Sequence, residues 1–396
     1  MSDLGLGLTI LSLGIWVGLL GFRGQFWRAD QRLEAEVSDI ETWPSVWAVV
    51  PARNEANLLP VTMRALLSQN YSGDFKVVLV DDQSTDGTAS VAQQIAQALN
   101  KNDQLTIRLT TPLPSGWTGK LWALEQGIQQ AQSQSPPDYL WLTDADIEHD
   151  ASVLRRLVAK AEQEKLDLVS LMVLLRCQSF WEHLLIPAFV FFFQKLYPFR
   201  WVNDPSKSTA AAAGGCILIR RSTLNRVGGI QVIHQALIDD CALAQATKAD
   251  AQGRIWLGVS SLARSLRPYP ALETIWEMVA RTAFTQLNYS PLLLLGTLLG
   301  MGLLYGAPPV AAVVGILGRN WLIAIVGFAG WLLMAFAYLP TLRLYRCSPL
   351  LAFCLPAIAF LYTAMTLDSA LRHWRGQGGA WKGRVYSVPA NHQARN

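Results

Sequence analysis

Long stretches of this chain contain no charged residue. Of its 396 residues only 16% are charged, below the roughly 25% that is usual in soluble proteins. Asp, Glu, Lys and Arg are absent from residues 4–22, 291–318, 320–342 and 347–367. Each stretch is about as long as the ~20 residues that cross a bilayer. The composition therefore argues against an ordinary soluble protein and a disordered chain, and the charged middle of the chain argues against a transporter.

Cysteine is scarce, and the middle of the chain has no surplus of positive charge. The five cysteines form no C-x-x-C pair, which predicts reduced thiols facing the cytosol and neither a disulfide framework nor a zinc site. Residues 290–396 hold eight bases and one acid, whereas residues 23–289 hold slightly more acids than bases. Because the basic surplus belongs to the apolar end, no nucleic-acid partner is expected.

The first apolar run predicts an uncleaved membrane anchor over residues 1–23. No positive segment precedes it and no small-x-small cleavage site follows it, as a signal peptide would require. Arg23, Arg28 and Arg32 come directly after it, and the positive-inside rule then places the following domain, residues 24–289, in the cytosol. We therefore expect a multi-pass protein of the cytoplasmic membrane.

Residues 290–370 are expected to form a C-terminal transmembrane bundle, followed by a basic tail over 371–396. The run 291–318 contains Pro308 and Pro309, which is compatible with one tilted helix or with a hairpin of two short ones. The bases of the tail predict a cytosolic location, but four spans would put the tail outside. A re-entrant segment or a split of 291–318 would remove this conflict.

A further apolar stretch predicts a helix at the membrane interface over residues 184–201. It is rich in phenylalanine, contains Pro187, and is flanked by Lys195 and Arg200, a pattern typical of interfacial helices. The alternative is a buried core helix.

The middle of the chain alternates short β-branched runs with segments of helical periodicity. The expected strands are 46–50, 76–80, 105–109, 139–143 and 168–173, and the expected helices lie near 57–69, 87–99, 118–133 and 151–165. Strands and helices that alternate in this way predict an α/β domain with a mostly parallel sheet covered on both faces.

Acidic residues follow three of these strands. Glu55 comes after the first, Asp81 and Asp82 after the second, and Asp144 and Asp146 after the fourth. Parallel strands bring their carboxyl ends to one edge, where open α/β sheets bind ligands. Clustered carboxylates repel one another, so we expect a divalent metal that carries a diphosphate. Asp86 and Asp150 are instead expected to be helix-cap or turn residues.

These segments resemble the family 2 glycosyltransferases, which have the Rossmann-like GT-A fold. The matching segments are Val50–Glu55, Asp81–Thr88, Gly119–Leu124, Asp144–Asp146 and the stretch from Gly214 to Asp240. Within the family, the chain is similar to ceramide glucosyltransferases and more closely to hopene-associated glycosyltransferases, because of Gly116–Lys120, Leu142–Ile147, Ala280–Leu287 and Trp381–Arg384. The Q-x-x-R-W motif of polymerising relatives would fall at 278–282, where only Arg281 matches, so the resemblance implies transfer of a single sugar.

The resemblance also implies roles for individual residues. Asp146 would ligate Mg²⁺ or Mn²⁺, with Asp144 directed to the metal or the ribose. The nucleotide sugar would contact Pro51, Ala52, Glu55, Asp82, Lys120 and Asp144. Asp240 would be the general base, with Asp239 as its rival, and a single base in a direct displacement implies inversion at the anomeric carbon. Arg281 would stabilise the leaving phosphate; the alternative is a cytosolic arginine that flanks the membrane.

The expected function is transfer of one sugar from a UDP-sugar to a lipid acceptor, either a hopanoid or another isoprenoid. Two alternatives stay open. Arg220, Arg221 and Arg226 are compatible with a polyprenyl phosphate acceptor, and a non-catalytic nucleotide-binding membrane scaffold would share the same segments.

Overall fold

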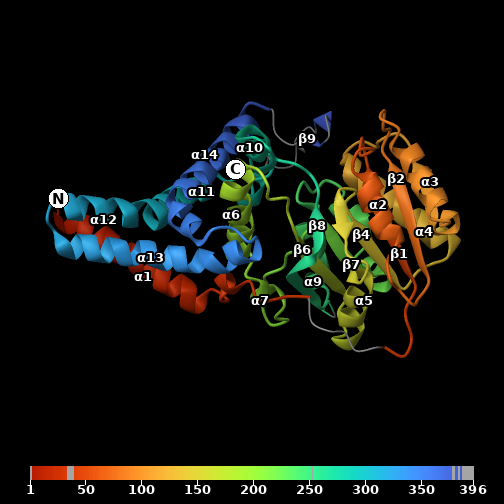
Figure 1. Cartoon of the computed structure of the whole chain (residues 1–396), viewed down its shortest axis with the longest axis horizontal. Coiled ribbons are helices and arrows are strands. Elements are labelled where there is room, and N and C mark those ends of the chain that lie inside the picture. Colours follow the sequence, from red (N-terminus) through yellow and green to blue (C-terminus); the bar gives the residue numbers. More distant parts are fainter. Residues whose placement is uncertain (1, 34–39, 252, 377–379, 382–383, 386–396) are drawn as a thin grey trace. The chain divides into compact units, whose positions relative to one another are not determined.

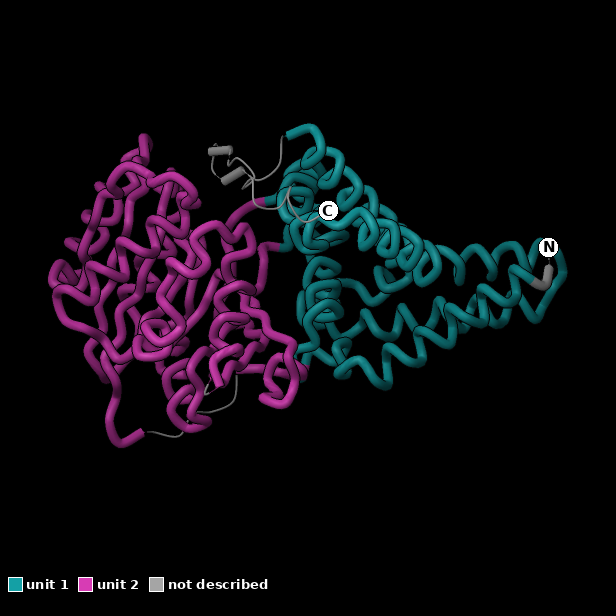
Figure 2. Tube along the Cα trace, turned by 180° about the vertical axis from the view of Figure 1, so that it is seen from behind, with its two compact units in different colours: residues 1–29, 177–200, 269–379 teal, residues 30–176, 201–268, 380–396 magenta. Residues whose placement is uncertain are grey.

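The computed structural model describes residues 2–33, 40–251, 253–376, 380–381 and 384–385. The chain divides into two compact units, coloured separately in Figure 2. Unit 1 comprises residues 1–29, 177–200 and 269–379, and unit 2 comprises residues 30–176, 201–268 and 380–396. The segments 177–200 and 269–289, expected within residues 24–289, thus group with the apolar helices. Much of the expected basic tail, including Lys382 and Arg395, lies outside the described residues.

Unit 2 is built on an eight-stranded sheet with the order β3-β2-β1-β4-β7-β6-β8-β5. Four of the seven neighbouring pairs are parallel, and the pairs β4–β7, β7–β6 and β8–β5 are antiparallel. The strands are β1 (Val46–Ala52), β2 (Phe75–Asp81), β3 (Leu105–Leu109), β4 (Tyr139–Thr143), β5 (Ile147–His149), β6 (Leu168–Leu174), β7 (Cys216–Arg220) and β8 (Ile255–Ser265). A separate pair joins β9 (Ala380–Trp381) to β10 (Arg384–Val385). The mixed α/β sheet confirms the predicted fold class, and the five predicted strands are present; β5, β7 and β8 were not predicted.

Helices cover both faces of the sheet, as Figure 1 shows. Val77 and Leu79 of β2 share one core with α2 (Leu59–Leu67), α3 (Thr88–Ala98) and α5 (Val153–Gln163). On the other face, α4 (Gly119–Gln134) approaches so closely that a Cβ on Gly127 would lie 2.8 Å from a methyl group of Val80. Residues that alternate along a strand point to opposite faces, so β2 is apolar throughout because both of its faces are buried. The remaining helices of this unit are α7 (Phe199–Val202, shared with unit 1), α8 (Arg221–Arg226) and α9 (Asp239–Ala249).

Unit 1 consists of helices. They are α1 (Ser2–Phe22), α6 (Phe180–Leu196), α10 (Leu272–Ala280), α11 (Pro291–Met301), α12 (Ala307–Leu317), α13 (Trp321–Leu344) and α14 (Leu355–Trp374). Four segments in the described part of the chain are long and apolar enough to cross a membrane: Leu4–Phe22, Pro291–Leu317, Trp321–Leu344 and Pro349–Trp374. Glycines bring α12 and α13 together, because a Cβ on Gly327 would lie 2.6 Å from the backbone nitrogen of Ala312.

Residues 291–317 form one continuous helical segment and not a hairpin. A π-helical turn, Gly302–Gly306, joins α11 to α12. Pro308 and Pro309 fall in the first turn of α12, where missing N–H groups and a fixed φ are tolerated. The carbonyl of Leu304 in the π-turn accepts a hydrogen bond of 2.9 Å from the Trp16 indole. The alternative of one helix is therefore confirmed, and the hairpin of two short helices is not formed.

Helix α14 packs on α6, α10 and α11. The Tyr362 hydroxyl donates to the carbonyl of Leu185 on α6 at 2.9 Å. The Asp368 carboxylate accepts a hydrogen bond of 2.7 Å from the Trp276 indole on α10. Arg372 pairs with Glu277 at 2.7 Å. The C-terminal half of α14 thus makes polar contacts with α10.

Candidate active site

Acidic side chains gather at the carboxyl edge of three parallel strands in unit 2. Asp81 is the last residue of β2, and Asp144 follows β4 directly. Both strands run parallel to β1, which ends three residues before Glu55. The predicted grouping at one edge of the sheet is therefore present.

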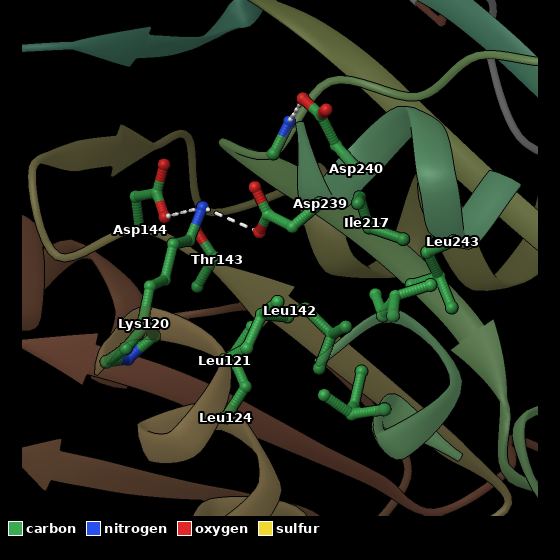
Figure 3. Close-up of a pocket in the computed structure, with 14 residues that line it drawn as sticks. Lys120, Leu121, Leu124, Leu142, Thr143, Asp144, Ile217, Asp239, Asp240 and Leu243 are labelled. Carbon is green, nitrogen blue, oxygen red and sulfur yellow. Dashed lines mark hydrogen bonds and ion pairs between the residues drawn. The ribbon is translucent and has the colours of Figure 1, made fainter. Parts of the chain in front are cut away.

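Lys120 is the cation of a pocket at this edge. Its Nζ lies 3.0 Å from Asp144 Oδ1 and 3.2 Å from Asp239 Oδ2, as Figure 3 shows. Helix α4 positions it: the Thr118 side chain caps the helix by accepting from the Leu121 N–H, which puts Lys120 in the first turn. Burial lowers the pKa of Lys120, but the carboxylates of Asp144, Asp239 and Asp240 outweigh burial and raise it above its usual range. The ammonium group therefore stays charged.

Asp240 lines the same pocket from the start of α9. Its Oδ2 accepts from the Gly214 N–H at 2.8 Å and its Oδ1 from the Cys241 N–H at 2.7 Å. Burial, and then the negative charge of Asp239, raise the pKa of Asp240 to about 6, although Lys120 and both backbone hydrogen bonds oppose this. A carboxylate with this pKa is a stronger base than an ordinary aspartate and is still ionised at neutral pH.

Asp146, the second acid of the D-x-D segment, is held by residues at the end of β8. Its Oδ2 accepts from the Ser265 hydroxyl at 2.6 Å, and its Oδ1 lies 3.4 Å from the Arg267 guanidinium. Arg267 also binds Glu55 Oε1 at 2.6 Å. Arg267 therefore joins the acid that follows β1 to the acid that follows β4. Sequence reasoning missed Arg267 because β8, the strand that carries it to this edge, was not predicted.

The carboxylates of the pocket suit a hard divalent cation. Burial raises the pKa of Asp144, and the nearby charges of Asp146 and Asp239 raise it further, against the effect of Lys120. Such mutual repulsion is relieved by a cation with oxygen ligands. Asp144 and Asp146 are the residues that would hold the metal.

Asp82 is the first residue after β2 and begins the turn there. It is buried, its Oδ1 accepts from the Thr110 hydroxyl at 3.1 Å, and its Oδ2 lies 3.4 Å from Arg53. The carbonyl of Ala52 accepts from the Asp82 N–H at 2.8 Å, so Ala52 supports this turn through its backbone, whereas Pro51 lines the pocket.

Residues 47–228 match the family model described as glycosyl transferase family 2. The match begins in β1 and ends after α8, so a little under half of the chain is similar to this family.

Curated and structural relatives agree with this assignment. The chain is 25% identical over 284 residues to the probable glycosyltransferase YdaM of Bacillus subtilis, a match of 68% of this chain and 60% of YdaM. It is 33% identical over 117 residues to the beta-monoglucosyldiacylglycerol synthase of Synechocystis sp., a match of 29% of this chain and 22% of the synthase. The chain thus spans less than two thirds of either relative.

A solved structure shows the same fold over almost the whole chain. It is the mannosyltransferase PcManGT from Pyrobaculum calidifontis, solved in complex with GDP-Man and Mn²⁺. The match covers 93% of this chain and 99% of PcManGT with a TM-score of 0.51 and 18% identity. At this identity the likeness supports the GT-A fold alone.

Other predicted residues are not among those that line this pocket. Arg281 follows the last residue of α10 in unit 1 and is exposed, so its role stays a prediction. Asp86 and Asp150 are turn residues as expected: their carboxylates accept from the backbone N–H groups of Thr88 and Ser152.

The arginines considered for an acceptor phosphate are engaged elsewhere in the domain. Arg220 pairs with Glu162 at 3.0 Å, and Arg226 pairs with Asp250 at 2.8 Å. Arg221 donates to the carbonyl of Pro137 at 2.7 Å. All three arginines therefore make contacts within the protein.

Proposed function

We propose that this chain is a membrane-bound, metal-dependent, inverting glycosyltransferase that moves one sugar from a UDP-sugar to a lipid acceptor. The observation that carries the proposal is Asp240, a carboxylate with a raised pKa that shares one pocket with Lys120 and Asp144. A base, a cation and a candidate metal ligand are the groups that sugar transfer from a nucleotide requires.

Asp240 acts as the general base. It accepts the proton of the acceptor hydroxyl as that oxygen attacks the anomeric carbon and the bond to the diphosphate breaks. The N–H groups of Gly214 and Cys241 hold the carboxylate in place. Displacement in a single step inverts the anomeric configuration. Asp239, the rival base, is instead paired with Lys120, which favours Asp240.

The departing diphosphate acquires negative charge, and the pocket offers positive charge to meet it. Lys120 contributes its ammonium group. The role of Arg281 at the leaving phosphate, through a bidentate contact, stays a prediction from the resemblance. A Mg²⁺ or Mn²⁺ ion held by Asp144 and Asp146 supplies Lewis-acid stabilisation of the leaving group when bound.

The nucleoside occupies the turns that follow β1 and β2. We assign ribose and uracil contacts to Glu55 and Asp82 and backbone contacts to Pro51 and Ala52. Arg267 keeps Glu55 and Asp146 in fixed orientations through its contacts with both carboxylates. Because Arg267 holds both Glu55, which is assigned to the nucleoside, and Asp146, which is assigned to the metal, it positions the residues that bind the donor.

The acceptor is a lipid, a hopanoid or another isoprenoid. In addition to its catalytic domain, the chain has four apolar helical segments that are long enough to cross a membrane. A water-soluble acceptor would not require them. The diacylglycerol-based name of the Synechocystis relative agrees with a lipid acceptor. A polyprenyl phosphate acceptor is less favoured, since Arg220, Arg221 and Arg226 already have partners.

We further propose that α1, α11–α12 and α13 cross the cytoplasmic membrane and that α14 stays at its cytosolic face. Arg343 and Arg346 precede α14, and Arg372 and Arg375 lie at its end. The positive-inside rule then puts both ends of α14 on the cytosolic side. The ion pair of Arg372 with Glu277 suits an aqueous boundary better than a bilayer core. Three spans also put the tail in the cytosol, which resolves the conflict that four spans create.

The test is release of nucleoside diphosphate by the full chain purified in detergent. A panel of nucleotide sugars would be assayed with Mn²⁺ or Mg²⁺, with and without total lipid extract. Lipid-stimulated release of UDP from one donor, lost on chelation of the metal, is expected. UDP release that depends on added polyprenyl phosphate would identify this phosphate, and not a neutral lipid, as the acceptor. Metal-dependent UDP binding without turnover under any of these conditions would favour the scaffold alternative, and absence of both turnover and UDP binding would refute the assignment of the pocket.

A further inference from the structure

Unit 1 contains a cluster of two cysteines and one histidine that the proposed sugar transfer does not use. Cys177 precedes α6, His183 lies in the first turns of α6, and Cys347 follows α13. One potential ligand atom from each residue lies within 4.8 Å of the others. The two cysteines are 170 residues apart in the chain, so a search for short cysteine motifs does not predict the cluster.

The distance between the two sulfur atoms fits a shared metal ion. Cys177 Sγ and Cys347 Sγ are 3.8 Å apart. Two thiolates at ~2.3 Å from a tetrahedral Zn²⁺ are separated by about 3.8 Å, whereas a disulfide requires about 2.05 Å. The pair therefore has the spacing of two ligands of one ion.

A backbone carbonyl fixes the tautomer of His183. Its Nδ1 lies 2.8 Å from the carbonyl oxygen of Ser179. Because a carbonyl can only accept, Nδ1 carries the proton, and Nε2 keeps the lone pair that binds a metal. Metal-binding histidines generally donate their other N–H to such a partner, which fixes the tautomer and the ring orientation.

The surrounding backbone holds the three ligands in place. Glu182 accepts from the N–H groups of Gln178 and Ser179 and from that of Tyr269. These hydrogen bonds fix the segment that carries Cys177 and His183, and they commit the nearest carboxylate to the backbone. The Cys347 N–H donates to the carbonyl of Leu342 at 2.9 Å. Three protein ligands thus leave a fourth position for water.

We propose that Cys177, His183 and Cys347 form a site for a soft divalent metal ion, Zn²⁺ in the cell, that ties the start of α6 to the end of α13. Binding replaces the two thiol protons, which are released to solvent, by two metal–sulfur bonds. The site differs in chemistry from the carboxylate set of the glycosyltransferase domain, because thiolates select zinc-like ions and carboxylates select Mg²⁺ or Mn²⁺.

The test uses the full chain, purified in detergent under reducing and metal-free conditions and titrated with Co²⁺. One equivalent should give thiolate-to-cobalt charge-transfer absorption and the visible bands of four-coordinate cobalt, and Zn²⁺ should displace it. Cys177→Ser and Cys347→Ser should abolish the charge-transfer band, and His183→Asn should weaken binding roughly tenfold or more. Cys354→Ser is the matched control: this exposed cysteine lies outside the cluster and its variant should bind as the wild type does.

A cobalt titration that gives no charge-transfer band, or a charge-transfer band that survives Cys177→Ser and Cys347→Ser, would refute the site. So would a Cys177–Cys347 disulfide without metal in protein purified without reductant, which would make the pair a redox couple. If the variants fail to fold, the wild type still decides: Zn²⁺ should protect Cys177 and Cys347 from alkylation and leave Cys354 reactive. Equal reactivity with and without Zn²⁺ contradicts the proposal.

Discussion

Replacing Asp240 by Asn tests the assignment of the general base most directly. The amide keeps the size of the side chain and one acceptor oxygen, which can accept from the N–H group of Gly214 or from that of Cys241 but not from both. It cannot take the proton of an acceptor hydroxyl. General-base catalysis contributes about 10²–10⁴ in rate, so kcat should fall by about that factor while the affinity for the UDP-sugar changes little.

The pH dependence of the wild type gives a second measure of the same group. Asp240 works as a base only when ionised, and its pKa is raised to about 6. The rate should therefore be nearly constant above pH 7 and fall as the pH drops through about 6, reaching about a tenth of its maximum at pH 5. In Asp240→Asn, the residual rate should lose this acid limb.

The thermal stability of the variant separates catalysis from folding. A carboxyl group whose pKa is raised in the folded state stabilises the fold below its unfolded pKa, and this contribution is lost as the pH rises through about 6. At pH 8 the ionised Asp240 is thus a cost, and the melting temperature of Asp240→Asn should be equal to or above that of the wild type. Asp150→Asn, in a turn outside the pocket, is the activity control. An Asp240→Asn enzyme that keeps more than a tenth of the wild-type kcat at an unchanged melting temperature would refute the reasoning.

Three further predictions concern positioning, packing and topology. Arg267→Gln removes the positive charge that Glu55 and Asp146 share, and it should lower the unfolding free energy by about 2–4 kcal/mol and weaken UDP binding. Arg264→Gln changes an exposed surface pair and should lower the unfolding free energy by less than about 1 kcal/mol. Equal effects of the two variants in denaturant unfolding would contradict the bridging role of Arg267. In Gly327→Leu the new side chain meets backbone atoms of α12, which should lower the unfolding free energy by about 1–3 kcal/mol. In Gly300→Leu the new Cβ has no described atom within 4 Å, so the melting temperature in detergent should stay nearly unchanged. Fusions at the C-terminus should give fluorescent green fluorescent protein and inactive alkaline phosphatase, and the opposite pair of results would require α14 to span the membrane.

Much of the fold could be predicted from local pattern. The strands 105–109 and 139–143 were predicted with the bounds of β3 and β4, because short β-branched and aromatic runs between turns are typical of strands. The helix expected near 87–99 corresponds to α3 (Thr88–Ala98), which begins after the turn that Asp86 stabilises. The acids were placed at one edge of the sheet because direction along parallel strands follows from alternation with helices.

Antiparallel strands and the partners of charged groups were beyond such reasoning. Strand β7 inserts between β4 and β6 and runs against both, although it follows β6 only after a long helical excursion through α6. Local periodicity does not encode which distant strand is the neighbour, since this depends on how the whole sheet closes.

The sequence by itself determined the apolar helices, five of the eight strands of the large sheet and the acidic residues that follow three of them, because each depends on the order of residues within a short window. Only the tertiary structure decided that Lys120 lies between Asp144 and Asp239, that Arg267 joins Glu55 to Asp146, and that two cysteines meet in unit 1. These contacts link residues that are far apart in the chain. Their geometry follows from the packing of complete elements, and no local pattern of residues specifies it.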